Sequence, residues 1–211
     1  NYLLSASPER YLKKVKDKLV SQPIKGTLAR SPDDLCVDGL VKKQLKESAK
    51  DRSENVMIVD LVRNDLSKIC EEGSVTVEEL FGIYSFPLVH HMISTVVGNL
   101  KKGTSFSDIL KATFPMGSMT GAPKKKVMEL IDQYEESPRG IYSGTVGYFT
   151  PEKDFDFNVV IRSIVYDKTS KHVSFHAGGA ITDSSVPEKE YEECLLKARA
   201  MLQVFTENEE V

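Results

Sequence analysis

Two pairs of acidic residues have the spacing that places both carboxylates on one face of a helix. Asp51 precedes Glu54 by three positions, and Glu190 precedes Glu193 by the same interval. Neighbouring like charges on a helix repel each other. A hard cation such as Mg²⁺, which binds carboxylates, water and an anionic substrate, would relieve that repulsion. The simpler alternative is that both pairs lie on solvated helix faces of a charge-rich protein.

A lysine stands in a constrained segment, residues 23–30, with the sequence PIKGTLAR. Lys25 lies between a proline, whose ring fixes its own φ angle, and a Gly-Thr turn. An amine can act as a nucleophile when burial or a neighbouring cation keeps it neutral near pH 7. An isolated lysine is more commonly a solvated surface charge, so this segment alone does not assign a reaction.

Three further segments have residues suited to binding an anion. FPMGSMTGAPKKK, at 114–126, is a glycine-rich turn that leads into a helix, where backbone N–H groups can bind an oxyanion. It lacks the spacing of a P-loop, and an ordinary helix-start loop would have the same composition. HAGGAI, at 176–181, is a weaker signal because paired glycines often mark a bulge. Arg162 lies in the apolar segment VVIRSIV, so it must meet a carboxylate of the protein or of a ligand.

Two adjacent histidines lie in VHHMISTVVGNL, residues 89–100, which is rich in β-branched residues and is predicted to form a strand. Because side chains alternate along a strand, His90 and His91 should point to opposite faces of the sheet. His91 shares its face with Ile93 and Val97, a setting more typical of a buried structural histidine than of a catalytic one.

The rest of the pattern supplies the elements that must position these groups. Extended segments are predicted on both sides of a turn near Lys16 and Asp17, and SVTVEELF, at 74–81, is predicted to form a strand and then a turn. Residues 33–70 are predicted to be helical with an interruption near Ser53. The absence of a regular βαβ alternation favours an α+β fold with largely antiparallel sheets. Further helices are predicted at 105–113, at 122–136 and after Ser185, and strands at GIYSGTVGYF, FDFNVVIRSIVYD and KHVSFHAGGAI.

The composition is that of a globular protein, with 211 residues of which 40% are hydrophobic and 28% charged. The net charge of -3 argues against a nucleic-acid-binding protein, and no apolar run approaches the ~20 residues needed to cross a membrane. Cys36, Cys70 and Cys194 are too few and too widely spaced for a disulfide framework, which favours the reducing cytoplasm. The N-terminal residues NYLLSASPER lack the charged and apolar regions of a signal peptide. The sequence also lacks a starting Met and opens within a strand-like segment, so we expect earlier residues to be missing.

Taken together, these segments resemble the chorismate-utilising enzymes, which include anthranilate synthase component I, aminodeoxychorismate synthase component I, and the isochorismate and salicylate synthases. The resemblance implies an α+β fold of two orthogonally packed, mostly antiparallel sheets flanked by helices. It also implies that residues 1–211 are the C-terminal part of a single chorismate-binding catalytic domain. The matching segments, in the order of the family, are SASPERYL, PIKGTLAR, AKDRSENVMIVDLVRNDL, GSVTVEELF, FPLVHHMISTVVG, FPMGSMTGAPKKKVMELID, RGIYSGTVGYF, VVIRSIV and HAGGAITDSSVPEKEYEE.

The lysine segment favours one branch of the family, because aminodeoxychorismate synthases carry PIKGT where anthranilate synthases usually have alanine in place of the lysine. Asn55 and His90 favour the same branch. The resemblance implies amination of chorismate at ring C4 to 4-amino-4-deoxychorismate, for the synthesis of 4-aminobenzoate and folate, with ammonia from a separate glutamine amidotransferase. The alternatives are anthranilate synthase component I, which also eliminates pyruvate, and a non-catalytic chorismate-binding fragment. The acidic pairs alone would also suit a metal-dependent hydrolase.

The resemblance also implies roles for individual residues. Lys25 is implied to attack ring C2 with loss of the C4 hydroxyl, after which ammonia attacks C4 and expels the lysine. Mg²⁺ is implied to bind Glu54 and Glu193. Asp51 and Glu190 would support the water molecules of this cation. The other implied site residues are His91, as a catalytic group beside the departing hydroxyl, and Thr27, Ser118, Thr120, Tyr142, Arg162, Gly178 and Gly179, as substrate-binding groups.

Overall fold

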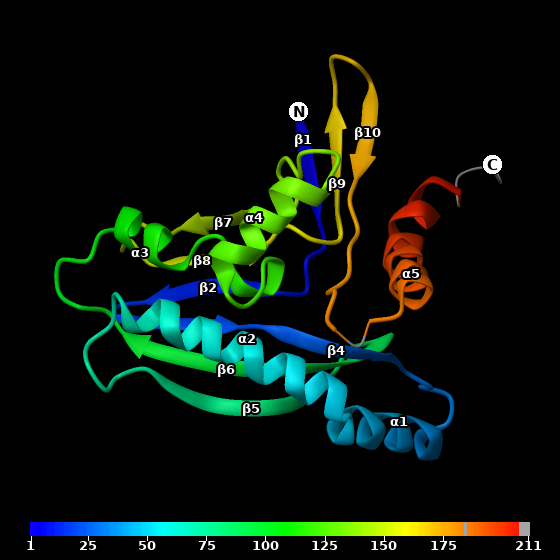
Figure 1. Cartoon of the computed structure of the whole chain (residues 1–211), viewed down its shortest axis with the longest axis horizontal. Helices are drawn as coiled ribbons and strands as arrows, with labels where there is room; N and C mark the ends of the chain where they lie inside the picture. Colours follow the sequence, from blue (N-terminus) through cyan, green and yellow to red (C-terminus); the bar gives the residue numbers. More distant parts are fainter. Residues whose placement is uncertain (184, 207–211) are drawn as a thin grey trace. The chain divides into compact units, whose positions relative to one another are not determined.

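The computed structural model describes residues 1–183 and 185–206, which form two compact units interleaved along the chain (Figure 1). One unit, here called the terminal unit, comprises Asn1–Pro8, Ser137–Val146 and the residues from Asn158 onward. The other, here called the central unit, comprises Glu9–Glu136 and Gly147–Phe157. The assignment of the chain to part of a single catalytic domain stays a prediction.

The central unit is built on a sheet in which β6 has partners on both sides. β5 pairs with one edge of β6, and β4 and β3 pair with successive halves of its other edge, all antiparallel. Nearly every residue of β6 is buried, as its run of β-branched residues predicts. The strands, in the spatial order β4-β6-β3-β2-β8-β7 with β5 added beside β6, are β2 (Arg10–Val15), β3 (Lys18–Gln22), β4 (Ile24–Ala29), β5 (Thr76–Ser85), β6 (Val89–Asn99), β7 (Thr145–Phe149) and β8 (Phe155–Val159).

Helix α2 covers one face of this sheet with a buried apolar stripe that includes Ile58, Val59 and Leu66. Burial of each such side chain contributes about 1.5–3 kcal/mol. The predicted interruption near Ser53 was wrong: helix α1 ends before Ser48, whose hydroxyl accepts a hydrogen bond from the backbone N–H of Asp51 and so caps α2. The helices of this unit are α1 (Leu35–Glu47), α2 (Ala49–Ser67), α3 (Phe106–Thr113), the 3₁₀ turn η1 (Gly117–Met119) and α4 (Lys124–Tyr134).

The terminal unit contains a three-stranded antiparallel sheet, β1 (Tyr2–Ser5), β9 (Ser163–Asp167) and β10 (His172–Phe175), and helix α5 (Pro187–Thr206). FDFNVVIRSIVYD was predicted as one strand, but β8 ends at Val159 and β9 begins at Ser163. Between them Arg162 has a φ of 48°, which is incompatible with strand geometry. Three other strand limits also differ: β5 continues to Ser85, β7 begins only at Thr145, and β10 ends at Phe175, so that HAGGAI lies outside the strand predicted for KHVSFHAGGAI.

Within the described ranges 1–183 and 185–206, we find no helix with the length and apolar character needed to cross a membrane.

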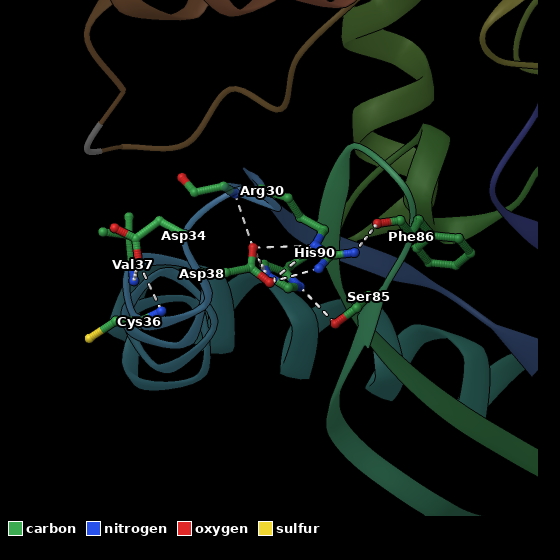
Figure 2. A network of polar contacts seen from close by, with 9 residues as sticks. Arg30, Asp34, Cys36, Val37, Asp38, Ser85, Phe86 and His90 are labelled. Carbon is green, nitrogen blue, oxygen red and sulfur yellow. Dashed lines mark hydrogen bonds and ion pairs between the residues drawn. The ribbon is translucent and has the colours of Figure 1, made fainter.

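A polar network around the buried Asp38 and His90 connects α1 with β5, β6 and the residues that follow β4 (Figure 2). The guanidinium of Arg30 donates to both carboxylate oxygens of Asp38, with the shortest contact 2.8 Å, and the backbone N–H of Ser31 donates at 3.0 Å. His90 places Nε2 3.1 Å from the same carboxylate and Nδ1 2.9 Å from the hydroxyl of Ser85. These contacts, above all the hydrogen bonds from Arg30, hold the pKa of Asp38 well below its usual range.

Replacing Asp38 with asparagine is expected to lower the free energy of unfolding at about pH 7, because Arg30 and the buried His90 lose their carboxylate. The pKa of Asp38 is lowered in the folded state, so its contribution is present above about pH 4 and is lost as the pH falls through the folded-state value. Urea unfolding of the wild type and the variant should therefore converge as the pH is lowered. A difference that stays constant with pH would contradict this origin.

Candidate active site

Lys25 of β4 is held against helix α2 by a bulge. The register between β4 and β6 shifts within this segment, where Gly26 has a φ of 87°. A Cβ atom at Gly26 would lie 3.0 Å from the side chain of Asp51 on α2, so only glycine fits here without strain. Lys25 places Nζ 3.6 Å from Oε2 of Glu54, and both side chains are largely buried. The Lys-Gly pair in PIKGT thus directs an amine into the unit rather than into solvent.

Thr27 and His91 face each other across the β4–β6 pair. The hydroxyl of Thr27 lies 2.8 Å from Nδ1 of His91, and the ring of Phe86 packs edge-on against the imidazole, with centroids 5.3 Å apart. His91 is buried. Its neighbour His90 contacts Asp38, so the prediction that the two histidines point to opposite faces is confirmed.

Glu9, a residue that the sequence analysis missed, lies beside this cluster. Its side chain is buried, the hydroxyl of Ser118 hydrogen-bonds it, and Lys25 is close enough to act on it electrostatically. Burial raises the pKa of Glu9 to about 7, and the contacts with Ser118 and Lys25 oppose this rise. A carboxyl group that titrates near neutral pH can deliver a proton there, which is the property needed in a general acid.

The glycine-rich loop packs against α2 and presents only one of its two predicted hydroxyls to this cluster. A Cβ at Gly117 would lie 3.1 Å from Leu61 of α2, which shows how closely the loop approaches the helix. Ser118 reaches Glu9. The hydroxyl of Thr120 instead donates to the carbonyl oxygen of Met116 at 3.0 Å, so it stabilises the loop.

The terminal unit brings the two predicted glycines against two other predicted side chains. A Cβ at Gly178 would lie 3.1 Å from the hydroxyl oxygen of Tyr142, and one at Gly179 would lie 3.2 Å from Oε2 of Glu190. Glu190 is buried and accepts a hydrogen bond of 2.9 Å from the hydroxyl of Ser185. A side chain at either glycine would therefore crowd these groups.

Arg162 belongs to the same group in the terminal unit. Burial lowers the pKa of its guanidinium, and the electrostatic influence of Tyr142 and Glu193 opposes this decrease. The ring of Tyr142 stacks on His176, with centroids 5.4 Å apart. Glu193 is paired with Lys197 of the next helical turn at 2.6 Å. A cation, a phenol and exposed backbone at glycine suit the binding of a carboxylate.

The carboxylates predicted to bind Mg²⁺ are each paired with lysine. Glu54 contacts Lys25 at 3.6 Å and Lys50 at 4.0 Å, and Glu193 contacts Lys197. Carboxylate oxygens are the ligands that Mg²⁺ prefers, so the chemistry of these donors fits the cation, which would compete with the lysines. Among the residues that the structure describes, no group of three acidic, histidine or cysteine side chains is close enough to hold a metal ion.

Comparison with known proteins identifies the family. Residues 1–203 match the profile of the chorismate binding enzymes. The chain belongs to this family. Relatives include the probable aminodeoxychorismate synthase, chloroplastic, of Oryza sativa subsp. japonica, 50% identical over 205 residues that cover 96% of this chain and 22% of the relative. Aminodeoxychorismate synthase component 1 of Escherichia coli K12 is 42% identical over 200 residues, covering 95% of this chain and 44% of the relative. The chain thus spans less than half the length of either relative.

Solved structures of chorismate binding enzymes share the fold. Anthranilate synthase component I from Streptococcus pneumoniae superposes with a TM-score of 0.80 and 32% identity, covering 94% of this chain and 43% of that one. The predicted α+β class is confirmed, and so is the resemblance to the family. The roles of the individual residues stay predictions, with Glu9 added to them by its position beside Lys25.

Proposed function

We propose that this chain carries catalytic residues of an aminodeoxychorismate synthase, which replaces the C4 hydroxyl of chorismate with ammonia. The observation that carries this proposal is the placement of Lys25, which is largely buried in a glycine-dependent bulge beside Glu54 and Glu9. A lysine with only a surface role requires no such placement. The names of the rice and E. coli relatives support the same assignment.

In the proposed reaction, Lys25 first loses its ammonium proton to solvent. Nζ of the neutral amine then forms a bond to ring C2, the two ring double bonds shift, and the C4 hydroxyl departs. Glu9 supplies a proton to this hydroxyl, so that it leaves as water. Ammonia then bonds to C4, the double bonds shift back, and the C2–Nζ bond breaks to release Lys25. His91, fixed by its contact with Thr27, orients the C4 hydroxyl. Covalent catalysis of this kind divides one difficult substitution into two easier ones.

The two carboxylates of chorismate require cationic partners. Arg162 and Tyr142 are proposed to bind the enolpyruvyl carboxylate, with Gly178 and Gly179 leaving backbone accessible to the substrate. When bound, Mg²⁺ would supply a positive charge for the ring carboxylate. Glu54 and Glu193 are the proposed ligands.

The product of the reaction tests this assignment. Incubation of the protein with chorismate, MgCl₂ and an ammonium salt is expected to yield 4-amino-4-deoxychorismate, identified by chromatography and mass spectrometry. Direct release of fluorescent anthranilate with pyruvate would instead assign the chain to anthranilate synthase component I. Calorimetric binding of chorismate without any product would support the non-catalytic chorismate-binding alternative.

Removing either proposed metal ligand is expected to weaken Mg²⁺ binding. The variants Glu54→Gln and Glu193→Gln keep the size of the side chain but lose its charge, and we expect the dissociation constant for Mg²⁺ to rise by at least about tenfold. Calorimetric titration of Mg²⁺ in the presence of chorismate measures this effect without turnover. Glu188→Gln, at an exposed position of the same helix as Glu193, is the matched control. Unchanged affinity in both test variants would exclude these ligands.

We also propose that the ammonia comes from a separate glutamine amidotransferase subunit. The designation component 1 of the E. coli relative supports the existence of another component. Glutamine should replace ammonium salts only when an amidotransferase is added.

We also propose a cytoplasmic location for this protein. The rice and Arabidopsis thaliana relatives are named chloroplastic, so localisation of the tagged full-length protein is the test.

A further inference from the structure

A small, partly open cavity adjoins Glu9 in the central unit. Its volume is about 20 Å³, and it is lined by residues of β2, β3, α2, α3 and the loop that contains η1. A cavity needs roughly 10–15 Å³ to hold one water molecule, and the water needs two to four polar partners. The space therefore suits a single small molecule that forms hydrogen bonds.

The wall of the cavity provides such partners. Glu9, just before β2, and Tyr11, within β2, both line it. The hydroxyl of Tyr11 lies 2.5 Å from that of Thr113, and Thr113 donates its own proton to the carbonyl oxygen of Ile109 at 2.7 Å. Tyr11 must therefore be the donor to Thr113, which leaves the phenol oxygen able to accept another hydrogen bond.

We propose that one water molecule in this cavity links the carboxyl group of Glu9 to the hydroxyl of Tyr11, which makes Tyr11 a positioning residue for the proton that Glu9 carries. The water donates one hydrogen to the phenol oxygen and the other to the carboxylate of Glu9. It therefore stabilises the ionised form of Glu9 and fixes the orientation of its carboxyl group. This inference rests on the proposed function, in which Glu9 is the acid.

The other ionisable groups at the cavity have hydrogen-bonded or oppositely charged partners. Burial raises the pKa of Tyr11 to about 12, and the charge of Asp65 adds to this effect, so the phenol stays protonated. Asp65 is paired with Lys124 at 2.5 Å and with Lys68 at 2.9 Å. Burial raises the pKa of Glu9 to about 7, so the protonation of this carboxyl group changes near neutral pH. The remaining charged groups that face these residues are Lys25, which acts on Glu9, and Arg10, which pairs with Asp156.

The variant Tyr11→Phe tests the link because it retains the ring, which packs against Phe114, and removes only the hydroxyl. The water then loses an acceptor and the carboxylate of Glu9 loses a donor, so the pKa of Glu9 rises. Since the protonated form is the acid, the loss of amination with increasing pH should move to higher pH by roughly half a unit to one unit. Tyr134→Phe, the same change at an exposed position of α4, should leave the profile unchanged.

A measurement without substrate separates this inference from the proposed function. The infrared band of the protonated carboxyl group of Glu9, assigned by its loss in Glu9→Gln, should disappear at a higher pH in Tyr11→Phe than in the wild type. This shift, together with an ordered water in a high-resolution crystal structure, would support the link even if no amination were found. Identical midpoints for the band in Tyr11→Phe and the wild type would overturn it.

Discussion

Replacing Lys25 with alanine is expected to lower kcat for chorismate amination on the order of a thousandfold or more, because the proposed nucleophile is removed. Lys25 is largely buried beside Glu54, where the proposed reaction needs its amine. Steady-state assays with ammonium salts measure the loss. Mass spectrometry of the quenched wild type should detect a substrate adduct on the peptide that contains Lys25.

Two further variants distinguish the loss of the reactive amine from the loss of the positive charge beside Glu54. Lys25→Arg retains a positive partner for Glu54 but lacks a reactive amine, so it should be as inactive as the alanine variant. Lys50→Ala removes the other, more exposed lysine that contacts Glu54 and should keep most of the activity. Full activity in Lys25→Ala would show that ammonia attacks the ring directly.

Replacing Glu9 with glutamine is expected to lower kcat by about 10²- to 10⁴-fold, the range typical for loss of a general acid. The amide has the shape of the carboxyl group but cannot release a proton. Because the pKa of Glu9 is raised to about 7, wild-type activity should be present below this pH and fall as the pH rises through it. The pH profile of the Glu9→Gln variant should lack this fall in activity near pH 7.

A control for Glu9 is Glu71→Gln, the same chemical change at an exposed position of the central unit. This variant should retain both the rate and the pH profile of the wild type. If the activity of Glu9→Gln still fell as the pH rose through about 7, another group would be the source of the proton.

The elements that sequence reasoning predicted well are those that depend on local periodicity. The alternation along β6 correctly placed His90 and His91 on opposite faces of the sheet, because successive side chains of a strand point to opposite faces. The boundary between α1 and α2 was misplaced because both Ser48 and Ser53 are suitable caps. The hydrogen bond from the N–H of Asp51 selects Ser48. Nothing in the apolar run around Arg162 signals its positive φ, since the run lacks glycine and proline.

The candidate site was predictable where a residue has an unusual sequence setting. Lys25 stands out because proline and glycine flank it, and the structure shows why the glycine is needed against Asp51. Glu9 had no such signal beyond an acidic residue between a proline and a strand. Its raised pKa results from burial by residues distant in the chain, a tertiary property that spacing does not reveal.

The pairing of Lys25 with Glu54 also has a consequence for the resting protein. An amine engaged with a carboxylate is a poor target for stray electrophiles, such as aldehydes, that would otherwise modify it irreversibly. If Glu54 binds the divalent cation as proposed, the cation and the amine compete for the same oxygen atoms. The lysine would then be released only when the cation arrives, so that the amine is protected until the cation needed for substrate binding is in place.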